Sequence, residues 1–280
     1  MTRIVITSDL HLGITSAAIL RTLMSTIAAE EPDLTVLAGD IGEGLPNVVE
    51  CLKIFAQLPG EVAVLAGNHD VWARANYSSQ DLWERHLPET VRAAGMLWLE
   101  ETVWQHDRIA VAGSLAWYDY SAADPTIPPY PPKFFAERKG NYNLDAKYVH
   151  WPWSDPEFAV RLGDALCERL QGLETDPRVH SVLVVSHVPL FEEQMCRKPH
   201  DPHWGLSNAY FGNLTLGQRV QEMSKVQMVV SGHTHIGLKG QVRRPNFPEG
   251  HALSVSVLGS DYHAPVYSVI DSTTLEGNGS

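Results

Sequence analysis

The chain has 280 residues, of which 44% are apolar and 19% charged, and its formal net charge is −12. This composition is typical of a globular protein and excludes a disordered chain. The diffuse negative charge disfavours broad contact with nucleic acid or anionic lipid. The sequence shows no apolar run of membrane-spanning length and no signal-peptide pattern, so we expect a cytoplasmic protein without membrane contact.

Several short apolar runs, rich in Val, Ile and Leu, predict strands that are buried on both faces. These runs are residues 4–7, 34–38, 62–66, 182–185 and 228–230. Helix-like stretches at about residues 16–29 and 46–58 separate the first three runs. The alternation of strand and helix predicts right-handed crossovers and a largely parallel sheet.

The middle of the chain, residues 117–156, is dense in Pro, Trp, Tyr and charged residues. It is too long for an ordinary connection, so we predict a functional insertion or flap. Its aromatic side chains could stack on a substrate ring or could cover the edge of the sheet, and both interpretations stay open. Because the sequence shows no convincing linker, we expect one domain over residues 1–280.

Further elements are expected after this segment. A helix is predicted over about residues 155–173. Residues 236–242, 252–258 and 265–270 are typical of strands in a sequential antiparallel set.

Each of the five apolar runs is followed by residue types that ligate metals. They are Asp9 and His11, then Asp40, then Asn68 with His69 and Asp70, then His187, then His233 and His235. Ligands collect at the carboxyl ends of strands in open α/β sheets, so these groups should meet at one edge. Carboxylate, imidazole and amide donors without a thiolate suit Mn, Fe, Zn, Ni or Co.

Glycines precede three of these groups, at Gly39, Gly67 and Gly232. A residue without Cβ permits a sharp bend and a close approach of the backbone. Taken singly, each group has an ordinary structural interpretation: Asp40, for example, could cap a helix. Five such groups, each after a strand-like run, favour the metal site.

The ordered blocks resemble those of the calcineurin-like metallophosphoesterases: Asp-x-His, Gly-Asp, Gly-Asn-His-Asp/Glu, a lone His, and Gly-His-x-His. All five occur here in order, between Asp9 and His235. The resemblance implies an α/β fold, a four-layer α/β/β/α sandwich of two mixed β-sheets flanked by helices, with residues 117–156 as a loop-rich insertion.

The resemblance also implies a metal-dependent phosphoric ester hydrolase with two divalent or trivalent metal ions. The implied ligands are Asp9, His11 and His235 for one metal, Asn68, His187 and His233 for the other, and Asp40 for both. A hydroxide that bridges the metals would attack phosphorus in line with the leaving group.

In the same resemblance His69 is the general acid at the leaving group, and Asp70 is a catalytic residue or one that orients this segment. The phosphoprotein phosphatases of the family place Asp and then Arg where this chain has Glu43 and Gly44. Glu43 could still pair with His69. The missing Arg disfavours a protein phosphatase, although Arg74 or Arg197 could replace it.

The predicted function is hydrolysis of a phosphomonoester or phosphodiester of a small molecule. Candidate substrate-binding residues are Asn68, His69, Arg74, Trp204 and Tyr210. A cyclic nucleotide phosphodiesterase, a lipid-precursor pyrophosphatase and a nuclease are alternatives, and a protein phosphatase or non-catalytic scaffold is less favoured. The net charge and the lack of a basic stripe disfavour nucleic acid as a partner. The substrate, native metals and oligomeric state stay open.

Overall fold

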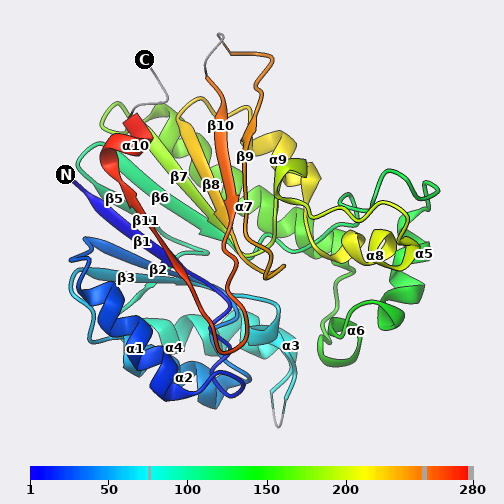
Figure 1. Cartoon of the computed structure of the whole chain (residues 1–280), viewed down its shortest axis with the longest axis horizontal. Helices are drawn as coiled ribbons and strands as arrows, with labels where there is room; N and C mark the ends of the chain where they lie inside the picture. Colours follow the sequence, from blue (N-terminus) through cyan, green and yellow to red (C-terminus); the bar gives the residue numbers. More distant parts are fainter. Residues whose placement is uncertain (75–76, 248–250, 277–280) are drawn as a thin grey trace.

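Two mixed β-sheets face each other between layers of helices in the computed structural model, which describes residues 1–74, 77–247 and 251–276 (Figure 1). The first sheet has the strand order β11 (Tyr267–Asp271), β1 (Arg3–Thr7), β2 (Leu34–Ala38), β3 (Glu61–Leu65) and β4 (Leu97–Trp98). The second has the order β5 (Val103–His106), β6 (Ile109–Ser114), β7 (Ser181–Ser186), β8 (Val226–Ser231), β10 (Leu253–Val257) and β9 (Leu238–Val242).

The α-helices are α1 (Ala17–Ala28), α2 (Leu45–Phe55), α3 (Ser79–Asp81), α4 (Leu87–Ala93), α5 (Pro132–Arg138), α6 (Asp145–Tyr148), α7 (Asp155–Thr175), α8 (Pro202–Ser207), α9 (Leu214–Val220) and α10 (Ser272–Glu276). Shorter helical turns are η1 (His69–Val71), η2 (Leu82–His86), η3 (Lys139–Asn141), η4 (Glu192–Gln194) and η5 (Asn208–Tyr210). Of the helices in the described part of the chain, none has the length and apolar character that a membrane crossing needs.

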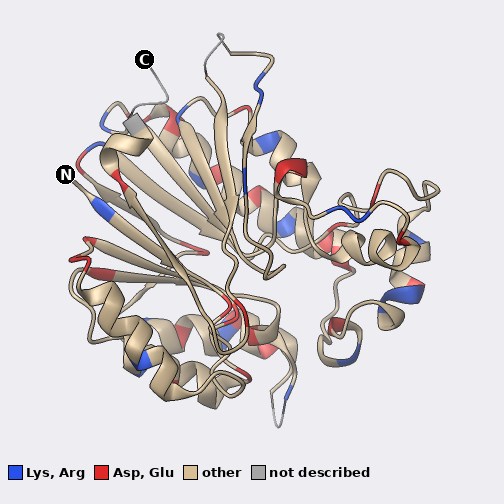
Figure 2. Ribbon diagram, in the orientation of Figure 1, with Lys and Arg blue, Asp and Glu red and all other residues tan. Residues whose placement is uncertain are grey.

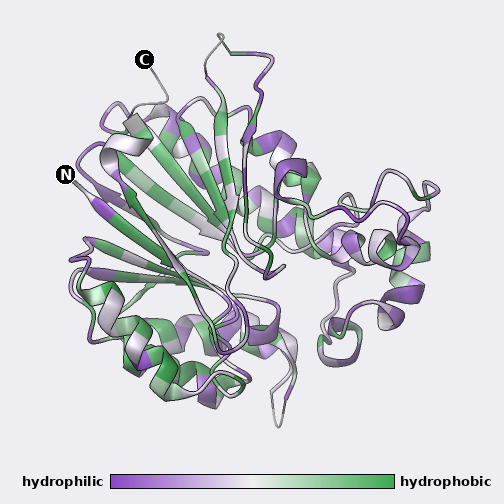
Figure 3. Ribbon diagram, in the orientation of Figure 1, coloured by the Kyte–Doolittle hydropathy of each residue, from purple (hydrophilic) through white to green (hydrophobic). Residues whose placement is uncertain are grey.

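The layers follow from the alternation of side chains along each strand. On β1, Ile4 and Ile6 belong to the cluster between the two sheets, whereas Val5 packs with the side chains of α1 and α2. The second sheet buries its outer face against α7 and α9. Both faces of the central strands are therefore covered, which explains their continuous apolar runs (Figure 3). The predicted four-layer sandwich is confirmed.

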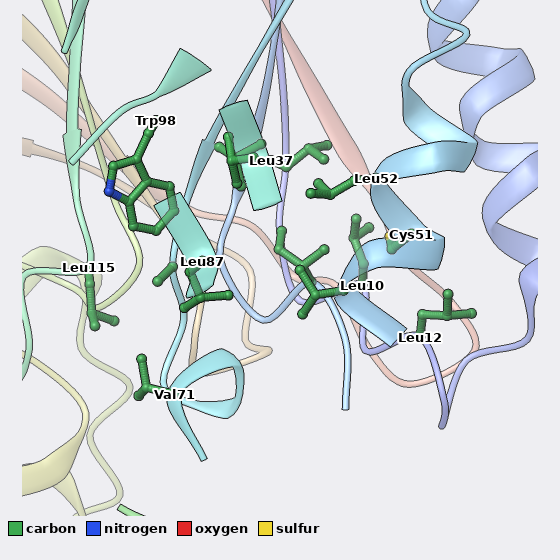
Figure 4. Close-up of a cluster of buried hydrophobic side chains, with 14 of the residues drawn as sticks. Leu10, Leu12, Leu37, Cys51, Leu52, Val71, Leu87, Trp98 and Leu115 are labelled. Carbon is green, nitrogen blue, oxygen red and sulfur yellow. The ribbon is translucent and has the colours of Figure 1, made fainter. Parts of the chain in front are cut away.

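Figure 4 shows part of the helix-side core of the first sheet, to which Leu37 of β2, Trp98 of β4, and Cys51 and Leu52 of α2 belong. All four side chains are buried. Strands β1 to β4 run parallel to one another, as predicted. Their carboxyl ends therefore lie at one edge of the sheet.

Two features of the sheets differ from the sequence-based expectations. Strand β6, a central strand of the second sheet, was not assigned, because it is built largely from small residues. A Cβ on its Gly113 would lie 2.5 Å from Leu99 Cδ2, so the close packing between the sheets requires a small residue there. The expected sequential antiparallel set at the end of the chain is wrong for β11, which pairs with β1 in the first sheet. Strand β10 pairs antiparallel with β9 but parallel with β8.

The predicted insertion, residues 117–156, lies with α8 beside the two sheets, where Figure 1 shows α5, α6 and α8 together. Trp117 and Tyr118 are fully buried in the same core cluster as α1 and α2. These two aromatic residues are therefore packing residues and offer no free stacking surface. Helix α7 begins at Asp155, at the end of the segment, with a capping box formed by Ser154 and Glu157.

Candidate metal centre

The loops after five strands bring the predicted ligands together. Asp9, Asp40 and Asn68 follow β1, β2 and β3, whereas His187 follows β7 and the last two histidines follow β8. We refer to Asp9, His11, Asp40, Asn68, His187, His233 and His235 as the seven-residue cluster. Figure 2 shows acidic residues on the loops beyond the strand ends of the first sheet.

Backbone strain gathers at this cluster. Five of its members have a positive φ, a conformation that residues other than glycine rarely adopt. They are Asp9 (56°), His11 (44°), Asp40 (53°), His233 (71°) and His235 (58°). Strained backbone of this kind is typical of functional sites, where the surrounding structure holds it in place.

The glycines near the cluster allow its loops to approach closely, as predicted. A Cβ on Gly67 would lie 2.1 Å from Asp40 Oδ1, and one on Gly232 would lie 2.5 Å from Asp9 Oδ2. Gly39 has a φ of 88°, and its Cβ would lie 2.5 Å from His187 Nδ1. No larger residue fits at these positions without moving a member of the cluster.

The distances divide the cluster into two groups that share Asp40. His235 Nε2 lies 3.6 Å from Asp9 Oδ1, and His11 Nε2 lies 3.5 Å from Asp40 Oδ2. The other oxygen of Asp40 lies 3.5 Å from His187 Nε2. Each oxygen of Asp40 thus faces a different histidine.

Hydrogen bonds on the far side of each ring identify the nitrogen that faces the centre. His187 Nδ1 lies 3.0 Å from the carbonyl of Ala38, and His233 Nε2 lies 3.1 Å from the carbonyl of Tyr210. A carbonyl only accepts, so these ring nitrogens carry the protons. In the neutral form in which histidine ligates a metal, both rings present their unprotonated nitrogens to Asn68 Oδ1, at 3.1 and 3.0 Å.

In that neutral form, electron-rich atoms converge without a donor between them. Asn68 Oδ1 cannot donate, so its approach to two ring lone pairs is unfavourable unless a cation lies among them. His11 Nε2 is buried and has no hydrogen-bond partner among the described residues. A metal ion would satisfy all these atoms, and the mixture of carboxylate, imidazole and amide donors suits a transition metal.

Protons and cations compete for this centre. Burial opposes ionisation of Asp40, but His187, His69 and His11 hold its pKa well below the usual range. Burial disfavours charge on His187 too, yet Asp40 raises its pKa to about 9. Burial and His187 lower the pKa of His233 to about 4. A metal that binds here must displace a proton from His187.

Glu43 connects three groups at the edge of the centre. Its Oε1 lies 3.0 Å from His11 Nδ1 and 2.7 Å from His69 Nδ1, and its Oε2 lies 2.5 Å from Arg74. The predicted pair of Glu43 with His69 is confirmed. Burial opposes the charge on His69, but Asp40 and Glu43 raise its pKa to about 9. Both ring nitrogens of His69 thus carry protons at neutral pH, and the ring is positively charged.

Asp70, the other predicted catalytic residue, is 1% exposed. Its Oδ1 accepts hydrogen bonds from the backbone of Ile41 (2.9 Å) and Gly42 (3.2 Å), and its Oδ2 accepts one from Gly67 (2.7 Å). These bonds tie the loop after β2 to the loop after β3. The carboxylate faces backbone and holds the loops that carry Asp40 and Asn68.

The candidate substrate-binding side chains lie in different surroundings. Arg74 is partly exposed, pairs with Glu43, and places its guanidinium 5.0 Å from the ring centre of Trp72. Trp204 donates to the carbonyl of Cys196. Tyr210 is fully buried and its hydroxyl donates to the carbonyl of Phe135, so its contact with the centre is through its own carbonyl.

Arg197, the other suggested replacement for the missing arginine, is committed to different partners. Its guanidinium pairs with Glu192 at 2.5 Å and donates to Asn208 Oδ1 at 3.0 Å. Arg74 is therefore the better placed of the two, because Glu43 holds it directly beside His69.

Two residues beside the centre were not found by sequence reasoning. The ring of Tyr262 lies 4.9 Å from that of His11 and 5.0 Å from that of His235. Its position after β10 resembles that of the ligands after other strands, and this signal could have indicated it. Asp145 accepts a hydrogen bond from Asn68, which is 77 residues away in the chain, and no local pattern marks it.

This fold and this site define a metal-dependent phosphoric ester hydrolase. The chain belongs to the calcineurin-like phosphoesterase family, whose sequence profile matches residues 2–237. The resemblance stated from the five blocks is thereby confirmed.

Solved structures share the fold at low sequence identity. The chain is similar to a phosphopantetheinyl hydrolase (PptH) from Mycobacterium tuberculosis, with 17% identity, a TM-score of 0.71 and 97% of each chain covered. It is also similar to a dimetal phosphatase from Danio rerio, with 14% identity and a TM-score of 0.54, over 96% of this chain and 91% of that one. No curated protein sequence matches this chain.

Proposed function

We propose that the chain hydrolyses a phosphomonoester or phosphodiester of a small molecule at a centre of two metal ions held by the seven-residue cluster. Asp9, His11 and His235 would hold one ion, Asn68, His187 and His233 the other, and Asp40 both. The observation that carries the proposal is the approach of Asn68 Oδ1 to ring nitrogens of His187 and His233, whose other nitrogens are held by backbone carbonyls.

The metals, when bound, would supply positive charge for the phosphoryl oxygens and lower the pKa of a water. The donor set suits Mn, Fe, Zn, Ni or Co. His69, protonated at neutral pH, would give its proton to the leaving oxygen. Glu43 holds the Nδ1 side of that ring, and Arg74 would contact the phosphoryl group from the same side.

The substrate class rests on charge and surroundings. A net charge of −12 disfavours a nucleic-acid substrate, so a nuclease would require a local basic surface. The similar M. tuberculosis structure is described as a phosphopantetheinyl hydrolase, and phosphopantetheinyl esters therefore belong among the compounds to be screened. A cytoplasmic location stays a prediction from the sequence.

The test begins with metal-free protein, to which Mn²⁺ and the other candidate metals are returned one at a time. Bound metal is counted by elemental analysis, and hydrolysis of p-nitrophenyl phosphate, bis-p-nitrophenyl phosphate and phosphorylated metabolites is followed. We expect two ions per chain and metal-dependent hydrolysis.

The variant Asp40→Ala with His235→Ala should lose both the metals and the activity. The matched control changes the same residue types at an exposed turn, as His106→Ala with Asp107→Ala, whose side chains are 49% and 70% exposed. Full activity of the first double variant would refute the proposal. Strong, salt-sensitive DNA binding in a gel assay would favour the nuclease instead.

A further inference from the structure

The carboxylate of Asp145, at the start of α6 in the predicted insertion, is fully buried beside the centre. Its Oδ1 accepts hydrogen bonds from Asn68 Nδ2 at 2.9 Å and from Trp72 Nε1 at 2.6 Å. Its Oδ2 accepts one from the hydroxyl of Tyr118 at 2.8 Å. Burying a carboxylate is costly unless donors surround it, and here three side chains supply them.

The bond from Asn68 to Asp145 decides which end of the amide faces the centre. With Nδ2 held by the carboxylate, Oδ1 points at His187 and His233. Rotation of the amide by half a turn would place its oxygen against the Asp145 carboxylate and its NH₂ where a ligand is needed. Both contacts would be unfavourable, because acceptor would face acceptor and a donor cannot ligate a cation.

Asp145 is itself held in place by the rest of the insertion. Its backbone N–H donates to Asn143 Oδ1 at 2.7 Å, and the carbonyl of Tyr148, at the other end of α6, accepts from Ala73 at 2.7 Å. A second buried carboxylate, Asp155, gathers other side chains of the segment. Its partners are Trp117 (2.8 Å), Tyr120 (2.5 Å) and Lys139 (2.7 Å).

We infer that Asp145 is a positioning residue of the metal centre, which fixes the amide of Asn68 with its oxygen toward the metal. The predicted insertion, residues 117–156, is then part of the metal site, because it supplies the group that orients a ligand. The inference rests on the proposed function, since it assigns a part to the second metal position.

The first test measures Mn²⁺ binding by titration calorimetry on metal-free protein and counts bound metal by elemental analysis. Loss of a group that orients a metal ligand typically weakens metal binding about 10- to 100-fold. We expect Asp145→Ala to weaken the Asn68, His187 and His233 position by this factor and to leave the Asp9, His11 and His235 position unchanged. Asp145→Asn should bind both ions nearly normally, because its amide oxygen can still accept from Asn68.

A double-variant cycle separates orientation from general support. A carboxylate at position 68 has two equivalent oxygens and needs no orientation, so Asn68→Asp should recover metal binding in the Asp145→Ala background. With Asp145 present, Asn68→Asp sets two carboxylates against each other and should weaken binding. If Asp145 only supported the fold, the two effects would simply add.

The matched control is Asp124→Ala, which removes another buried aspartate of the same segment. Asp124 accepts hydrogen bonds from its own turn, at Thr126, and its loss should leave both metal affinities unchanged. Circular dichroism checks the fold of each variant. Should Asp145→Ala fail to fold, Asn68→Asp alone carries the test, because undiminished metal binding by it would overturn the inference.

Wild-type affinity for both ions in folded Asp145→Ala would overturn the inference and leave the proposed function intact. Fewer than two ions in the unsubstituted protein would instead overturn the proposed function. The two failures are therefore distinguishable by the metal count alone.

Discussion

Replacing Asp70 distinguishes a residue that holds the loops from one that takes part in the chemistry. The carboxylate accepts from three buried backbone groups, those of Ile41, Gly42 and Gly67. A buried donor left without a partner costs about 1–3 kcal/mol. Asp70→Ala leaves all three donors without the carboxylate, although water that enters the space can replace part of the lost bonding. We therefore expect it to lower the free energy of unfolding by about 3–5 kcal/mol.

A milder variant tests the same estimate of the cost of each unsatisfied donor. Asp70→Asn keeps one acceptor oxygen, which can serve Ile41 and Gly42, but turns its NH₂ toward the N–H of Gly67. Asp70→Asn should therefore lower the free energy of unfolding by about 1–3 kcal/mol, the cost of one unsatisfied donor. We expect stability to increase from Asp70→Ala to Asp70→Asn and from Asp70→Asn to the unsubstituted protein.

The assay is urea unfolding of metal-free protein, followed by circular dichroism, with stability extrapolated linearly to zero urea. Metal is left out because ligand binding adds to apparent stability. Asp164→Ala, which changes an aspartate of α7 whose side chain is 64% exposed, is the control and should change stability little. If Asp70→Ala lost activity while its stability and metal content stayed normal, Asp70 would act in the chemistry and this reasoning would be refuted.

Two further predictions concern a proton donor and a buried acid. His69→Ala should keep its metals but lower kcat for alkyl phosphate esters by about 10²–10⁴-fold, as expected for loss of a general acid. The loss should be much smaller for p-nitrophenyl esters, because their leaving group needs no proton. Equal losses of kcat for both kinds of ester would contradict this role of His69. Burial, opposed by Arg169, raises the pKa of Glu100 from 4.5 to about 7. The folded protein then retains a proton that the unfolded chain has released, so stability should fall by about 3 kcal/mol as the pH rises through this window. Urea unfolding across the window should show a flatter profile for Glu100→Gln, and a profile parallel to that of the unsubstituted protein would count against the assignment.

Much of the architecture was predictable because its signals are local. The runs that became β1, β2 and β3 are largely apolar, since both faces of each strand are covered. Strand β6 escaped because alanine and glycine, needed where the sheets pack closely, weaken the strand signal. The pairing of β11 with β1 joins the two ends of the chain, and no local pattern specifies a partner so distant.

In the candidate metal centre, too, some residues were predictable from the sequence and others were not. The pair of Glu43 with His69 was foreseen from their places in neighbouring blocks and is present at 2.7 Å. Tyr262 and Asp145 were not foreseen, because they reach the centre from segments that carry no ligand motif.

The sequence alone determined the kinds of donor and their order along the chain, because each follows a strand within a few residues and such spacing survives in any parallel sheet. Only the tertiary structure decided which atoms face one another. The two faces of Asp40, the far-side partners of His187 and His233, and the bond from Asn68 to Asp145 all depend on how the sheets and the insertion pack. The close packing of the interior depends on all elements of the chain together. These contacts therefore form only in the folded protein and cannot be deduced from local sequence patterns.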